Sequence, residues 1–153
     1  MKQIFALNLL ALLVSGCATQ MVEKNANDSC KAQGKKAFIF DSKQSGIPLF
    51  MESASAMVLC VGPDDITHLP ATFGADAVSA SNFNGAGIIS VTPGLIADKA
   101  GIKANDIVYE FAGRPIERAR NLAAAVDSMS PGTEAIIKLR RNGAKEVTVT
   151  ALF

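Results

Sequence analysis

The second half of the chain constrains the fold most, because short apolar runs alternate there with turn residues at close spacing. Gly101 and the pair Asn142-Gly143 mark a helix end and a hairpin turn. The predicted elements are a strand at 87–91, a short helix at 95–99, a strand at 107–111, a longer helix at 117–129, and strands at 135–140 and 146–152. This order indicates a small α+β domain.

Within this half, the string GIISVTPGLIADKAGIKANDIVYEFAGRPI, residues 87–116, resembles the PDZ domains of bacterial HtrA-type periplasmic proteases. The likeness extends from about residue 71 to the C-terminus, and residues 97–108 are its most specific part. Asn105 stands where that family usually has glycine, but asparagine tolerates a positive φ. The resemblance implies a partly open β-barrel or sheet capped by two helices, over residues 70–153.

The same resemblance implies a peptide groove. Backbone N–H groups of the loop at 71–75 would bind a terminal carboxylate, residues 76–79 would be an edge strand for the peptide, and the long helix would form the other wall. The implied peptide-binding residues are Phe73, Gly74, Ala75, Asp76, Ala77, Leu122, Val126 and Met129. The alternative is that these apolar side chains are core residues and the groove is only a structural remnant.

The N-terminus reads as an export signal. Lys2 precedes an apolar run at 4–14, which is too short to cross a bilayer comfortably. Val14-Ser15-Gly16-Cys17 resembles the lipobox of bacterial lipoproteins, which implies a signal peptide at 1–16 and a palmitate-bearing lipid anchor on Cys17. By the same resemblance, Ala18 favours the outer membrane, facing the periplasm. A plain signal peptide that contains a cysteine is the alternative.

Between the signal and the PDZ-like half we expect a tether at 17–29 and a small β module at 30–69. Two β-like runs, at 37–40 and 56–61, lie between Cys30 and Cys60. An even pair of cysteines in an exported chain favours a disulfide, which contributes about 3 kcal/mol in the chain-entropy model. Two free buried thiols are the alternative.

The composition argues against several functions. The 153 residues carry a formal charge of +1, so we expect no nucleic-acid partner. His68 is the only histidine, which makes a metal site or a catalytic triad with Asp64 or Asp65 and Ser53 or Ser55 improbable, and no Gly-x-Ser-x-Gly occurs. We therefore expect no enzyme, no catalytic residue and no cofactor, and we interpret His68 as a polar residue between modules.

These observations predict a lipid-anchored periplasmic adaptor that binds C-terminal or exposed peptide segments of envelope proteins. Two alternatives stay open. One is a structural envelope lipoprotein with a vestigial groove, and the other is a regulatory partner of a separate periplasmic protease or secretion system.

Overall fold

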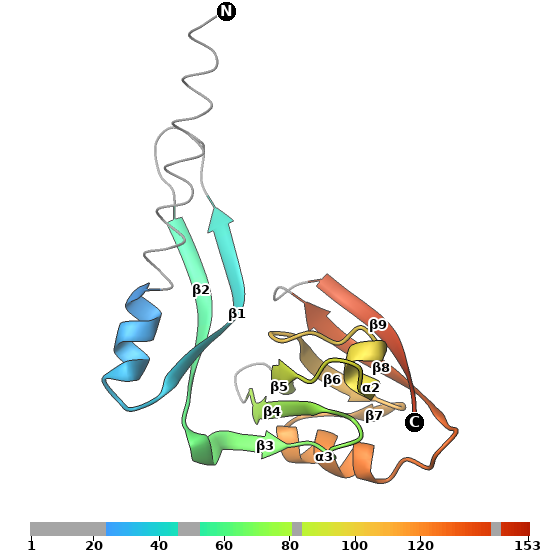
Figure 1. Cartoon of the computed structure of the whole chain (residues 1–153). Coiled ribbons are helices and arrows are strands. Elements are labelled where there is room, and N and C mark those ends of the chain that lie inside the picture. Colours follow the sequence, from blue (N-terminus) through green and yellow to red (C-terminus); the bar gives the residue numbers. More distant parts are fainter. Residues whose placement is uncertain (1–23, 46–52, 81–83, 142–144) are drawn as a thin grey trace, which may run out of the picture.

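The computed structural model describes residues 24–45, 53–80, 84–141 and 145–153 (Figure 1). The predicted signal peptide, the lipidation site at Cys17 and the first part of the tether lie outside these residues. In the described ranges, no helix combines the length and the apolarity that a bilayer crossing needs.

One antiparallel sheet organises the second half of the chain. Along its main path the order is β3-β4-β5-β6-β8-β9, and β7 pairs with β6. The strands are β3 (Ile66–His68), β4 (Ala75–Ser79), β5 (Ala86–Val91), β6 (Ile107–Phe111), β7 (Arg114–Pro115), β8 (Glu134–Arg141) and β9 (Lys145–Leu152). Two helices, α2 (Ile96–Lys99) and α3 (Ala119–Asp127), complete this half, and the predicted α+β fold is confirmed.

Alternating burial explains why these segments fold as they do. In β8, Ala135, Ile137 and Leu139 are buried while Ile136 between them is exposed, which is the pattern of a strand with one face on a core. In α3, Leu122, Ala125 and Val126 are buried at the spacing of one face of a helix. The helix is shorter than the predicted range 117–129.

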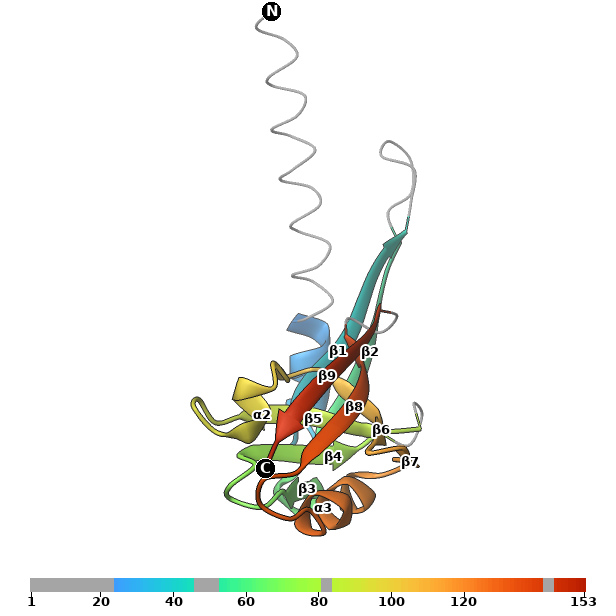
Figure 2. The ribbon, with the colours of Figure 1, turned by 90° about the vertical axis from the view of Figure 1, so that its right-hand side faces the viewer.

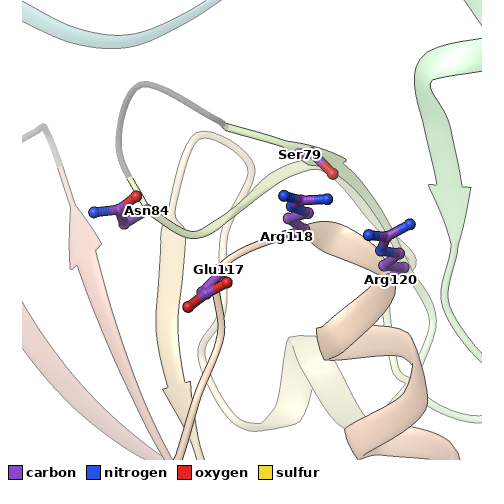
Figure 3. Close-up of a pocket in the computed structure, with 5 residues that line it drawn as sticks. All are labelled: Ser79, Asn84, Glu117, Arg118 and Arg120. Atoms are coloured by element: carbon purple, nitrogen blue, oxygen red, sulfur yellow. The ribbon is translucent and has the colours of Figure 1, made fainter.

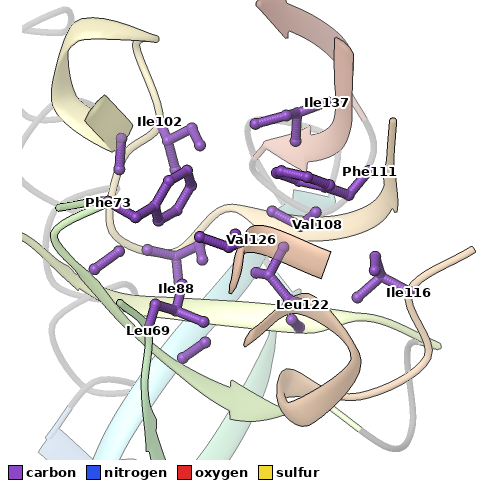
Figure 4. Packing of buried hydrophobic residues seen from close by; sticks show 14 of the residues in the cluster. Leu69, Phe73, Ile88, Ile102, Val108, Phe111, Ile116, Leu122, Val126 and Ile137 are labelled. Atoms are coloured by element: carbon purple, nitrogen blue, oxygen red, sulfur yellow. The ribbon is translucent and has the colours of Figure 1, made fainter. Parts of the chain in front are cut away.

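The buried faces meet in one hydrophobic cluster, which we call the main core (Figure 4). The ring of Phe153 stacks on Phe73, with centroids 5.9 Å apart, and meets Phe111 edge-on at 6.0 Å. The main core contains Leu69, Phe73, Ala75, Ala77, Ala86, Ile88, Ala97, Ile102, Val108, Phe111, Ile116, Ala119, Leu122, Ala125, Val126, Ala135, Ile137, Leu139 and Ala151.

A buried ion pair fixes the turn before β6. Asp106 is 1% exposed, and its carboxylate accepts hydrogen bonds from Arg141 Nε at 2.8 Å, Arg141 Nη2 at 2.7 Å and the Lys103 N–H at 2.8 Å. The hydrogen bonds to Asp106 raise the pKa of Arg141. Asn105 beside it has φ 72°, so asparagine does adopt the left-handed conformation there.

The N-terminal part is a helix followed by a long hairpin. Residues 24–31 are helical, although the sequence analysis interpreted most of them as a tether. Strands β1 (Lys36–Ser45) and β2 (Ser53–Val61) pair antiparallel, and both are longer than the predicted β-like runs at 37–40 and 56–61. The predicted disulfide between Cys30 and Cys60 is confirmed, with a Cα–Cα distance of 5.2 Å, and it joins the helix to β2.

The hairpin packs on the back of the sheet rather than around a core of its own. Phe40 is buried with Val61, Val78 and Ile107, so this cluster contains residues of β1, β2, β4 and β6. Phe40 therefore belongs to a core that the hairpin shares with the sheet.

The link between hairpin and sheet is short and structured. A single 3-10 turn, η1 (Pro63–Asp65), follows β2, and β3 follows it directly. The Asp65 carboxylate accepts a 2.9 Å hydrogen bond from the Gly62 N–H and pairs with Lys35 Nζ at 3.2 Å. Because β3 belongs to the sheet and Leu69 to the main core, the PDZ-like unit begins before residue 70.

Candidate functional site

The strand predicted to be an open edge is paired on both sides. β4 pairs antiparallel with β5 on one side and with β3 on the other. Both views place β3 beside β4, and Figure 2 shows β4, β3 and α3 in succession. The prediction that residues 76–79 form an unpaired edge is therefore wrong, because a segment of the same chain takes the peptide's place.

The pairing of β3 with β4 follows a regular antiparallel register. The partners are Ile66 with Val78, Thr67 with Ala77, and His68 with Asp76. One residue further on, the Leu69 N–H donates to the Ala75 carbonyl at 3.1 Å. Since hydrogen-bonded and non-hydrogen-bonded pairs alternate in such ladders, Thr67 and Ala77 form the next hydrogen-bonded pair.

The side chains of this segment point alternately to two faces. Leu69 is 6% exposed and belongs to the main core together with Leu122 and Val126 of α3. Ile66 packs instead against the cluster of Phe40 on the back of the sheet. Leu69 thus belongs to the same core as Leu122 and Val126, two of the residues that the resemblance implies for peptide binding.

In the loop that was predicted to bind a carboxylate, two backbone N–H groups donate hydrogen bonds to a carbonyl of the same loop. The Pro70 carbonyl accepts hydrogen bonds from the Phe73 N–H at 2.9 Å and the Gly74 N–H at 3.1 Å. Gly74 has φ +73°, and a Cβ there would lie 2.5 Å from Leu95 Cδ1, so only glycine fits both the turn and the contact.

The structure brings most of the predicted peptide-binding residues together. Gly74 is buried in the loop and Met129 is partly buried against the main core. Asp76 differs, because it lies on the opposite face of β4 from Ala75 and Ala77. The fully buried members of the predicted set, all in the main core, are Phe73, Ala75, Ala77, Leu122 and Val126.

Asp76 instead joins a polar cluster on that opposite face. Its Oδ1 lies 2.6 Å from His68 Nδ1, and its Oδ2 accepts a 2.7 Å hydrogen bond from Ser90 Oγ. Partial burial raises the pKa of Asp76, but the hydrogen bonds from Ser90 and His68 and the charge on His68 outweigh it, so the pKa lies below its usual value. This cluster connects β3 to β4 and β5.

The cluster contains the three residue types of a hydrolytic triad without its geometry. In a triad the serine bonds to the histidine and the acid orients the histidine. Here the Ser90 hydroxyl donates to Asp76, and His68 contacts the same carboxylate. The arrangement is that of a cross-strand polar contact. His68 therefore belongs to β3 of the sheet, not to a linker between modules as the sequence indicated.

A cavity of about 390 Å³ lies at the other end of β4 (Figure 3). Ser79 Oγ accepts a 3.2 Å hydrogen bond from the Ala119 N–H, which joins the end of β4 to the start of α3. Arg118 and Arg120 lie side by side near Ser79 in Figure 3. The lining residues are Ser79, Asn84, Glu117, Arg118 and Arg120.

Sequence reasoning missed Leu69 and the strand before it. A weak signal was available: residues 66–69 carry a β-branched pair and then a polar and an apolar residue, just before a turn that contains Pro70 and Gly74. A run of so few residues does not indicate which strand it will pair with.

Comparisons with known proteins identify the family of this chain. The PDZ domain family matches residues 58–152, which is more than half of the chain. The chain belongs to the PDZ domain family. The family match begins within β2 and includes β3.

Relatives of this PDZ domain are found in bacterial envelope proteases. The chain is 36% identical over 72 residues to a probable periplasmic serine endoprotease DegP-like of Rhizobium meliloti, covering 47% of this chain and 14% of that protein. It is 38% identical over 80 residues to the periplasmic pH-dependent serine endoprotease DegQ of Escherichia coli, covering 50% and 18%. The chain therefore spans less than a fifth of either relative.

Solved structures of this kind are also similar. The HtrA-type protease AlgW with a decapeptide gives a TM-score of 0.45 at 20% identity, over 53% of this chain and 27% of that chain. The HtrA3 PDZ domain bound to a phage-derived ligand, FGRWV, gives a TM-score of 0.40 at 26% identity, over 45% and 62%.

Proposed function

We propose that this PDZ domain binds extended peptide segments of envelope proteins between β4 and α3, and that it acts as an adaptor without chemistry of its own. One observation carries the proposal. An extended segment already lies in this position, paired antiparallel with β4, with the apolar side chain of Leu69 in the main core. A groove that accommodates this segment has the dimensions and hydrogen-bonding groups for another peptide of the same kind.

The groove favours a particular ligand chemistry. Phe73 and Gly74 offer two N–H groups to an oxygen acceptor, which a terminal carboxylate satisfies better than the neutral carbonyl of Pro70. The apolar surroundings of Leu69 favour a leucine-like terminal side chain. The preferred ligand is therefore a free C-terminus that ends in an apolar residue.

The cavity beyond β3 extends this preference. A peptide that continued upstream along β4 would reach Ser79, Arg118 and Arg120. Two guanidinium groups there favour an acidic residue about four positions before the terminus. Such an exposed pair contributes modestly, on the order of 1 kcal/mol or less.

The cell envelope is the proposed location. The curated relatives that match are periplasmic proteases, and the residues that resemble a lipobox end at Cys17. One added strand buries little surface, so the intrinsic affinity is modest. A lipid anchor on Cys17 offsets this by raising the effective concentration near partners in the same membrane, which we propose to be the outer membrane.

A second candidate is a structural envelope protein whose groove is vestigial. The burial of Leu69 in the main core favours it, because the peptide site is filled by the chain itself. The two candidates differ in one measurable property, the binding of an added peptide.

An array of peptides with free C-termini, probed with the full chain, tests the proposed function. Peptides that end in leucine, valine or phenylalanine should bind, and their C-terminal amides should bind at least about 10-fold more weakly. Val126→Thr places a hydroxyl in the apolar groove and should weaken binding, whereas Ala124→Thr on the exposed face of α3 should not. Equal signals from the free acids and the amides contradict the proposal.

A further inference from the structure

The segment at residues 66–69 occupies the position that we propose for a bound peptide. It runs antiparallel to β4, its Leu69 side chain enters the main core, and the Pro70 carbonyl receives the loop N–H groups of Phe73 and Gly74. The carboxylate of a free peptide that ended at the position of Leu69 would lie one residue before this carbonyl, beside the same loop. The segment therefore differs from a ligand chiefly in being continuous with the domain.

This segment is held less extensively than the C-terminal hairpin of the sheet. Only three residues of β3 pair with β4, whereas the pairing of β8 with β9 involves eight residues of each strand. The His68 side chain is 77% exposed, and Ile66 and Thr67 are only partly buried. Few buried contacts mean that a segment opens locally at a smaller free-energy cost than global unfolding.

Both ends of the segment are fixed, so an opened strand stays near the groove. Upstream, Val61 is buried on the back of the sheet and Cys60 forms the disulfide with Cys30. Downstream, Phe73 is fully buried. A short tethered segment competes at an effective concentration in the millimolar range.

We propose that residues 66–69 are an intramolecular ligand, which external peptides with a leucine-like residue in register with Leu69 must displace. This inference rests on the proposed function of the groove. The apparent dissociation constant then equals the intrinsic constant divided by the fraction of molecules with an open groove. If the groove is open in about one molecule in a hundred, binding is about 100-fold weaker than in an open domain.

Proline at position 67 opens the groove selectively. It removes an N–H of the hydrogen-bonded pair with Ala77, and it leaves α3 and the strands from β4 to β9 unchanged in sequence. Thr67→Val is the matched control, because it keeps the N–H, the shape and the β-branched side chain. Leu69→Ala is a second opening variant that acts through the side chain.

The probe is the fluorescein-labelled peptide GPDDITHL, the chain's own residues 62–69 with a free carboxyl end, and fluorescence anisotropy gives its dissociation constant. Thr67→Pro and Leu69→Ala should each bind it at least about 10-fold more tightly than the wild type and Thr67→Val. A version of the peptide with aspartate in place of its leucine should bind none of the four proteins. The thermal unfolding transition of each variant reports whether the domain is folded.

Two different failures are distinguishable. If all four folded proteins bind GPDDITHL with the same affinity, the groove is a peptide site but residues 66–69 do not block it, and the inference is wrong. If a folded Thr67→Pro or Leu69→Ala protein binds neither this peptide nor any member of the array, the groove is not a peptide site and the proposed function fails with the inference.

Discussion

The ring of Phe40 lies against the α-carbon of Gly87 in β5, so closely that a Cβ at position 87 would come within 2.6 Å of ring atoms Cε1 and Cζ. This contact fixes the N-terminal hairpin on the sheet. It also explains a glycine inside a strand, where glycine normally weakens the structure.

Gly87→Ala should therefore destabilise the protein by about 1–3 kcal/mol, the usual cost of overpacking. In a Phe40→Leu background, Gly87→Ala should lower the free energy of unfolding by clearly less, because the side chain that faces position 87 is smaller. Urea unfolding of the four proteins measures this coupling. Equal costs in both backgrounds would mean that the hairpin does not pack on Gly87.

Asp106→Ala should lower the free energy of unfolding by about 3–5 kcal/mol, because it leaves the Arg141 guanidinium and the Lys103 N–H without their buried acceptor. Asp98→Ala is the control, because that carboxylate is exposed and accepts one hydrogen bond from the Gly94 N–H. Urea unfolding at pH 7 should separate the two variants widely. Similar midpoints would contradict the structural role of Asp106.

The contact of Asp76 with His68 and Ser90 predicts a pH dependence. Because the pKa of Asp76 is lowered from its usual 3.8, the ionised carboxylate stabilises the fold above pH 3.8, and this contribution is lost as the pH falls through the lower folded-state pKa. Asp76→Asn should unfold at less urea than the wild type at pH 6, and the difference should shrink progressively below pH 3.8. A difference that does not change with pH would contradict the assignment.

The proposed lipidation of Cys17 gives a cellular prediction. If Cys17 carries the anchor, Cys17→Ala should move the protein from the membrane pellet into the soluble periplasmic fraction, because acyl chains supply an anchoring energy of about 0.8 kcal/mol per buried methylene. Cys60→Ala removes a different cysteine and should leave the remaining protein in the pellet. Pelleting of Cys17→Ala at the wild-type level would exclude the anchor.

The sequence predicted much of the fold because the decisive signals were local. The Leu122 and Val126 stripe, the left-handed Asn105 and the alternation of β8 each depend on residues within a few positions of one another. The candidate site was predicted in part for the same reason. Phe73 of the loop and Leu122 and Val126 of α3 belong to one core, and the binding of a peptide there stays a prediction.

The features that the sequence did not predict depend on contacts between residues far apart in the chain, or on strands too short to show a hydrophobic periodicity. β3 has three residues, and only its register with β4 makes it a strand. A phenylalanine such as Phe40 can pack into any hydrophobic core, so the residues around it did not indicate that it packs on Gly87. A hydrophobic pattern tells which face is buried, but not which element covers it.

Hydrogen exchange at the Leu69 amide tests the central claim most directly, because this N–H bonds to the Ala75 carbonyl only while residues 66–69 occupy the groove. In the full chain alone the amide should be protected. Saturation with GPDDITHL should make it exchange rapidly, while Ala77 stays protected by the incoming strand. A Leu69 amide that remains protected while the peptide is bound would contradict the account, since the peptide would then bind elsewhere.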